Sequence, residues 1–220
     1  MVLFVDLAAQ CAPQVSADLL GAIASIESGL QPLMVRSSAA SDIAGSAGEG
    51  IALAVGRLDA GRDVAIGLMG LDARTLGAAG LSYSEAFDAC RNLEAAGHVV
   101  DGMLKAAEKM GLSPSKAERH AVRAYFQRSL ARIETVDAYE ARVLAEKQTL
   151  GPGLNRLTIK GSATALTAGA RSVPRDVQRE ASATKMAEPV AVRASPKPAW
   201  DVFGGAPSSG LVAFSKAVPP

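Results

Sequence analysis

The sequence predicts an α+β, predominantly α-helical domain in residues 1–150, followed by a disordered tail in residues 151–220. Apolar residues recur at three- and four-residue spacing in several segments of the first part, which is typical of amphipathic helices. Aromatic residues make up only 4% of the chain, whereas glycine alone contributes 21 residues, so close helix packing is favoured over a large β-sandwich. Eight of the 11 prolines fall in the tail, which has no sustained hydrophobic period.

The first predicted helix begins after Ser16 and ends at Gly29. Ser16 is a good N-cap, and Val15 before it is spaced to contact Leu20 as a hydrophobic staple. Glycine is the residue that most often follows the last helical turn. The apolar stripe of this helix consists of Leu19, Ile23, Ile26 and Leu30.

The remaining elements follow from the same periodicity. Residues 31–48 are rich in Ser, Ala and Gly and are expected to form a loop with room for a short extended piece. Residues 64–71 are apolar but interrupted by glycine, and we expect a loop there too. A further region, to which no secondary structure is assigned, begins at Tyr83. Further helices are expected over residues 49–58, 73–79, 92–110, 115–130 and 136–147.

Glu27 stands at the border of the apolar stripe of the first helix, four residues after Ile23. Desolvation disfavours a charged carboxylate, so partial burial is expected to raise the pKa of Glu27 towards neutrality. A carboxylic acid in that range can protonate the leaving oxygen of a glycosidic bond. The helix alone leaves a second interpretation open, in which Glu27 is a solvated residue without a chemical role.

Two cysteines, Cys11 and Cys90, lie 79 positions apart. They are interpreted either as two small buried apolar residues or as one disulfide, which in the chain-entropy model stabilises the fold by roughly 4 kcal/mol. A disulfide requires an oxidising compartment such as the periplasm. Residues 1–11 are short and apolar, lack a positive n-region and are interrupted by Asp6, so they make a poor signal peptide. A truncated leader and another export route both stay open.

Several classes of function find no support. The net charge of +1 gives no argument for nucleic-acid binding, and no run of 18 apolar residues predicts a membrane span. His98 and His120 lack the spacing of metal ligands, so no metal is expected. Ser113 and Lys116 match Ser-x-x-Lys, but no partner motif follows, and a helix cap explains this serine better. No glycine-rich phosphate loop is present.

Four short motifs occur in a fixed order: Ile26-Glu27-Ser28-Gly29, Gly67-Leu68-Met69-Gly70, the run 90–97 and Ala124-Tyr125-Phe126. Together they resemble the lytic transglycosylases of the SLT (goose-type lysozyme-like) superfamily, over about residues 10–147. The pairing of Cys11-Ala12-Pro13 with the segment 88–92 resembles specifically the transglycosylases associated with type IV secretion systems. Residues 139–143 are similar to the closing Tyr-Val-x-Arg-Val segment of the family.

The resemblance implies a lysozyme-like fold that cleaves the β-1,4 bond between N-acetylmuramic acid and N-acetylglucosamine. The family's Glu before Ser is its only catalytic carboxylate, here Glu27. It protonates the leaving oxygen and then accepts the proton of the muramyl C6 hydroxyl, which gives a 1,6-anhydro product. Unlike a two-carboxylate glycosidase, this chemistry needs no second acid at a fixed separation. No cofactor is implied.

The resemblance also assigns residues that bind the glycan and contact the cleft, namely Ser28, Gly67, Leu68, Met69 and Tyr125. Tyr125 is expected to border the cleft, within reach of the catalytic carboxyl. Met69 is equally well explained as a core residue, and Asn92 is expected to cap a helix.

The sequence departs from the family pattern at three places. Gly70 replaces a Gln, Asp72 replaces an Asn, and Gln127-Arg128 replaces a small residue and Gly. The loss of an amide that binds sugar motivates an alternative function, a catalytically degenerate glycan-binding or scaffold protein. A hydrolytic lysozyme is a narrower alternative.

The tail carries a net charge of +5, against −4 for residues 1–150. It contains the only tryptophan, in Ala199-Trp200-Asp201-Val202-Phe203, which is similar to C-terminal segments of some secretion-associated transglycosylases. Trp200 and Phe203 are therefore interpreted as a docking motif for components of the secretion system, or as an accidental cluster. The expected setting is the periplasm, with peptidoglycan glycan strands as the other partner.

Overall fold

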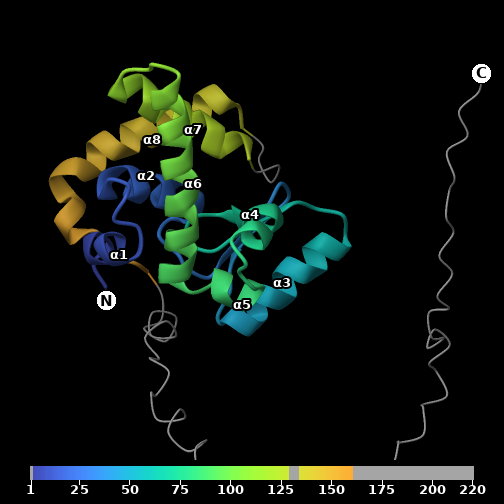
Figure 1. The fold of residues 1–220 in the computed structure, drawn as a ribbon. Coiled ribbons are helices and arrows are strands. Elements are labelled where there is room, and N and C mark those ends of the chain that lie inside the picture. The colour runs from blue at the N-terminus through green and yellow to red at the C-terminus, as the bar shows by residue number, and fades with distance from the viewer. Residues whose placement is uncertain (1, 129–133, 161–220) are drawn as a thin grey trace, which may run out of the picture. The chain divides into compact units, whose positions relative to one another are not determined.

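The computed structural model describes residues 2–128 and 134–160, which all belong to one compact unit (Figure 1). The expected docking residues Trp200 and Phe203 lie outside the described residues. The helices are α1 (Phe4–Cys11), α2 (Ala17–Ser28), α3 (Ala47–Asp59), α4 (Ala73–Ala78), α5 (Tyr83–Ala86), α6 (Ala89–Lys109), α7 (Pro114–Gln127), α8 (Val136–Leu150) and the 3₁₀ helix η1 (Gly151–Arg156). The strands are β1 (Met34–Ser37), β2 (Ser41–Ile43), β3 (Val64–Ile66) and β4 (Leu71–Asp72).

This arrangement confirms a mostly helical α+β fold with a small antiparallel sheet. Figure 1 shows the long helix α6 between α1, α2 and α8 on one side and α3, α4 and α5 on the other. Helix α2 packs against α8, and α7 packs against both α6 and α8. No helix in the described part of the chain combines the length and hydropathy needed to cross a bilayer.

The strands lie in the order β2-β1-β3-β4, and each neighbouring pair is antiparallel. Val35 pairs with Ile66, and Arg36 pairs with Ala65. The sequence predicted a loop with a short extended piece over residues 31–48, where the structure has β1 and β2. It predicted a loop over residues 64–71, which instead includes β3 and the first residue of β4. Strands of two to four residues are too short to show a hydrophobic period in the sequence. The pairing of β1 with β3 joins residues some thirty positions apart, so it has no local signal either.

Helix α1, Phe4–Cys11, was not predicted from the sequence. Phe4, Leu7, Ala8 and Cys11 of α1 are buried. The amide of Phe4 donates to the carbonyl of Leu157 at 2.8 Å, and the amide of Ile159 donates to the carbonyl of Val2 at 3.1 Å. Residues 157–160 therefore pack on the helical domain, beyond the boundary at residue 150 expected from composition. The periodicity of an eight-residue helix is too brief to recognise before its partners are known.

Two helix starts differ from their expected chemistry. Ser16 does precede α2, but its side chain makes no capping hydrogen bond to the helix backbone. Helix α6 begins at Ala89, and its N-cap is Asp88, whose carboxylate accepts from the amide of Arg91 at 2.9 Å. Asn92 is therefore not a cap; it lies inside the helix and is completely buried.

Candidate active site

Glu27 occupies the last turn of α2, and its side chain has no exposed surface. The phenol of Tyr139, on α8, donates a hydrogen bond to Oε1 at 2.6 Å. Nη2 of Arg36, on β1, forms an ion pair with Oε2, and Nη1 donates to the Glu27 carbonyl at 3.0 Å. Both carboxylate oxygens are thus held by groups from other elements of the fold.

The electrostatics of Glu27 combine two opposing effects. Burial disfavours the charged carboxylate, and the adjacent guanidinium of Arg36 favours it. Only the first effect could be predicted from the sequence, because nothing near Arg36 in the sequence links it to Glu27. A buried charge without such partners is strongly unfavourable, so Arg36 and Tyr139 account for the tolerance of an acid at this position.

The segment between β3 and β4, residues 67–70, lies directly beside Glu27. Ser28 ties it to α2, because its hydroxyl donates to the carbonyl of Leu68 at 2.7 Å. The backbone of Gly70 has a φ of +60°, and a Cβ built there lies 2.5 Å from Oε2 of Glu27. A side chain at position 70 and the present position of the carboxylate are therefore incompatible.

Asn92 holds the same segment from the side of α6. Its Oδ1 accepts from the amide of Met69 at 2.8 Å, and its Nδ2 donates to the carbonyls of Ile66 at 3.1 Å and Ala86 at 2.8 Å. A Cβ built on Gly67, which has a φ of +80°, collides with Asn92. The glycine and the asparagine together fix how closely the segment approaches α6.

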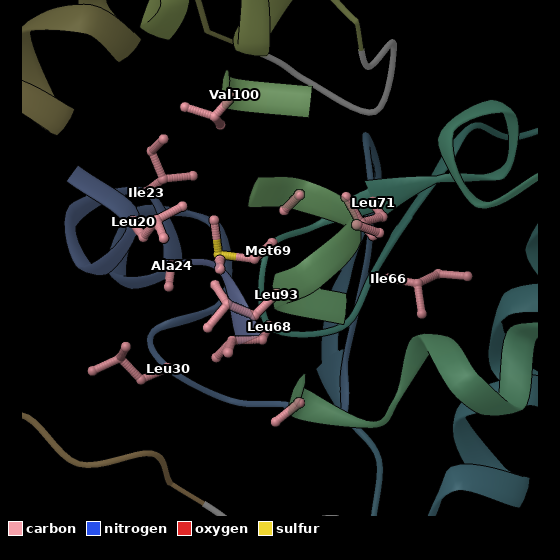
Figure 2. Packing of buried hydrophobic residues seen from close by; sticks show 14 of the residues in the cluster. Leu20, Ile23, Ala24, Leu30, Ile66, Leu68, Met69, Leu71, Leu93 and Val100 are labelled. Carbon is pink, nitrogen blue, oxygen red and sulfur yellow. The ribbon is translucent and has the colours of Figure 1, made fainter. Parts of the chain in front are cut away.

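Leu68 and Met69 are completely buried. Figure 2 shows both among core side chains that include Leu20, Ala24 and Leu93. These two residues therefore pack in the core next to the site. Their contact with a glycan stays a prediction.

Tyr125, on α7, is also completely buried, and its hydroxyl donates to the carbonyl of Met69 at 2.7 Å. The sequence analysis placed Tyr125 within reach of the catalytic carboxyl. The structure shows that Tyr139 donates a hydrogen bond to this carboxyl.

The position of Tyr139 depends on its neighbour in sequence, Glu140. The carboxylate of Glu140 is buried and accepts from Arg123 at 2.7 Å and from Arg119 at 2.5 Å, both on α7. These hydrogen bonds and charges hold the pKa of Glu140 below its ordinary value, with the bond from Arg123 contributing most and desolvation opposing it. They fasten α8 to α7 at the turn that carries Tyr139.

Cys11 and Cys90 form the expected disulfide between α1 and α6, 79 positions apart. Cys90 lies two residues before Asn92, so the disulfide links α1 to the part of α6 that holds the 67–70 segment. The described residues contain no group of three or more His, Cys, Asp or Glu able to bind a metal ion.

A model of the Transglycosylase SLT domain matches residues 5–141 of the chain, which is more than half of its length. The chain belongs to the SLT transglycosylase family. Domains of this family are those of lytic transglycosylases, which act on peptidoglycan. Neither a search of curated proteins nor a search of solved structures gave a significant match.

The match includes every residue of the candidate site described above, from Cys11 to Glu140. Two residues of the SLT domain that contact Glu27 were missed from the sequence. Tyr139 had a signal, since it opens the segment that resembles the closing motif of the family. Arg36 had none, because a single arginine in a short segment carries no pattern.

Proposed function

We propose that this SLT domain is a periplasmic lytic transglycosylase that cleaves the β-1,4 bond between N-acetylmuramic acid and N-acetylglucosamine, with Glu27 as its acid and base. The observation that carries the proposal is the fixed carboxyl of Glu27, held by Tyr139 and Arg36 inside an SLT domain.

In the proposed reaction the carboxyl of Glu27 gives its proton to the bridging oxygen as the bond from that oxygen to the muramyl C1 breaks. The resulting carboxylate then takes the proton of the muramyl C6 hydroxyl, whose oxygen bonds to C1. The proton returns to Glu27, and no water enters the product. Tyr139 orients the carboxyl through both steps.

Glu27 has no exposed side-chain surface, so a sugar oxygen reaches it only after a neighbouring group moves. The side chain of Arg36 is 19% exposed, and we propose that it is the group that moves aside. Its departure also removes the charge that favours the carboxylate, which assists the protonated form that the first step requires.

The test is the release of soluble products from purified peptidoglycan by the wild-type chain, Glu27→Gln and Glu27→Ala. We expect the wild type to release anhydro-muropeptides and both variants to release none while remaining folded. Glu94→Gln is the control, because Glu94 is a half-exposed acid of α6 that forms an ion pair with Arg91. Full activity in either Glu27 variant would refute the assignment, and products that carry an added water would indicate a hydrolytic lysozyme.

A second candidate function is glycan binding without turnover. Gly70 lacks the amide side chain of the family pattern, and the carboxylate of Glu27 is already occupied by an ion pair with Arg36. A binder of this kind sediments with insoluble peptidoglycan but releases nothing, so the sedimentation and product assays together separate it from an enzyme.

We further propose that the activity opens the cell wall locally for a type IV secretion system, and that the tail recruits the enzyme through Trp200 and Phe203. Support comes from the sequence pattern around Cys11 and Cys90 and from the tail motif. Because residues 157–160 pack on the domain, the test is a truncation after Lys160. Activity on purified peptidoglycan should survive while secretion falls, and unchanged secretion would remove the recruiting role.

A further inference from the structure

Arg128, the residue that follows α7, is held firmly over the segment that adjoins Glu27. Its Nη2 donates to the carbonyl of Gly70 at 2.9 Å, and its guanidinium carbon lies 4.0 Å from the centre of the Tyr125 ring. The carboxylate of Asp72 lies 3.6 Å from Nη1, an ion-pair distance that is too long for a hydrogen bond. Only 9% of the Arg128 side chain is exposed.

Two donor atoms of this buried guanidinium are unused. Within the described part of the chain, Nε and Nη1 of Arg128 have no hydrogen-bond partner, and the same holds for Nε of Arg36. Buried N–H groups without an acceptor are rare and unfavourable in folded proteins. The unsatisfied donors make Arg128 a candidate to bind an oxygen of another molecule. Both atoms have almost no exposed surface, so such an oxygen reaches them only after a neighbouring group moves.

The guanidinium of Arg128 and the proposed catalytic acid, Glu27, both lie next to one residue, Gly70. Gly70 accepts the hydrogen bond from Arg128 on its carbonyl, and the position of its missing Cβ lies 2.5 Å from Oε2 of Glu27. Gly70 thus lies next to both the carboxylate of Glu27 and the guanidinium of Arg128.

We propose that Arg128 is a specificity-determining residue that binds the acyl oxygen of the lactyl substituent on N-acetylmuramic acid. This inference rests on the proposed function. The lactyl group sits on C3 of the same ring whose C1 and C6 react, and N-acetylglucosamine lacks it. Both sugars carry acetamido and hydroxyl groups, so these do not distinguish them. A guanidinium is always charged and binds acid oxygens more strongly than neutral hydroxyls.

Two chemical forms of the lactyl group satisfy this geometry, a free carboxylate in glycan without peptide stems and an amide carbonyl in glycan that carries them. The experiment therefore uses three tetrasaccharides of equal length: stem-free muramyl glycan, stem-bearing muramyl glycan and chitin. Each is titrated by calorimetry into the full chain carrying Glu27→Gln, which prevents turnover, alone and combined with Arg128→Ala, Arg128→Lys or the control Arg91→Ala. Arg91 is half exposed on α6 and forms ion pairs with the half-exposed acids Glu85 and Glu94.

We expect the chain with Arg128 intact to bind a muramyl tetrasaccharide more tightly than chitin. Loss of one hydrogen bond to a charged group weakens binding by about 10- to 100-fold, so Arg128→Ala should abolish the preference by weakening the muramyl ligands alone. Arg128→Lys keeps the charge and should retain part of the preference. Arg91→Ala should leave all three affinities unchanged. The muramyl form that loses more affinity identifies the oxygen that is bound.

Equal weakening of all three ligands by Arg128→Ala would show that the residue only supports the 67–70 segment, and this would overturn the inference. Unchanged affinities, no preference for muramyl ligands, or no binding of any ligand would also overturn it. If circular dichroism shows that Arg128→Ala is unfolded, Arg128→Lys becomes the deciding variant. Its preference for muramyl ligands over chitin must then be smaller than that of the chain with Arg128 intact. Release of anhydro products by the wild type tests the proposed reaction separately. A preference for muramyl ligands without any products would refute the proposed reaction and still support the role of Arg128 in binding.

Discussion

Replacing Gly70 by alanine tests whether the position of Glu27 depends on the missing side chain. The new Cβ lies 2.5 Å from Oε2, 3.2 Å from Cδ and 3.3 Å from Cβ of Glu27. The carboxylate has little freedom to retreat, because Tyr139 and Arg36 hold its two oxygens. A left-handed backbone also costs an alanine about 1–2 kcal/mol relative to a right-handed one.

Gly80 supplies a matched control for the backbone contribution. Its φ is +66°, close to the +60° of Gly70, and a Cβ built there meets nothing within 4 Å. Gly80→Ala should therefore cost about 1–2 kcal/mol. Gly70→Ala should cost about 2.5–5 kcal/mol, since weakening one hydrogen bond to a charged group adds about 1.5–3 kcal/mol.

The measurement is the free energy of unfolding in urea for both variants, in the wild-type chain and in Glu27→Ala. Glu27→Ala removes the contacts at 2.5 and 3.2 Å and leaves only the one at 3.3 Å to the Cβ of residue 27. Most of the excess cost of Gly70→Ala over Gly80→Ala should therefore disappear in that background. Equal costs in the wild-type chain would refute the argument from geometry. An excess that persists in Glu27→Ala would place the strain elsewhere than at the carboxylate.

Two further predictions concern the elements around the site. Reduction of the Cys11–Cys90 disulfide should lower the free energy of unfolding by about 4 kcal/mol in the chain-entropy model, measured in urea with and without reductant; a change within error would show that the link constrains little. Glu140→Gln should destabilise the protein near pH 7, because Arg123 and Arg119 lower the pKa of the folded carboxyl below the ordinary 4.5. A lowered pKa stabilises the fold above the ordinary value, and this contribution is lost as the pH falls through the folded value. The difference between wild type and Glu140→Gln should therefore shrink on acidification below about pH 4.5, and a pH-independent difference would contradict the assignment.

The sequence by itself determined the longer helices of the fold and the family. Helices α2, α6, α7 and α8 were recognisable because each is long enough to show a repeated apolar face. The SLT assignment followed from short motifs in order, which are local features of the chain. Glu27, Cys11 and Cys90 could be singled out for the same reason.

Only the tertiary structure decided what surrounds Glu27. Arg36 reaches it from β1, which pairs with β3 some thirty residues away, and Tyr139 reaches it from α8, 112 positions along the chain. Asn92 looked like a helix cap in sequence, but in the fold its three hydrogen bonds hold the 67–70 segment. Such contacts have no local signature, because they depend on how close the elements pack. The sequence could therefore nominate an acid, while the packing of α2, α8 and β1 set the groups that hold it.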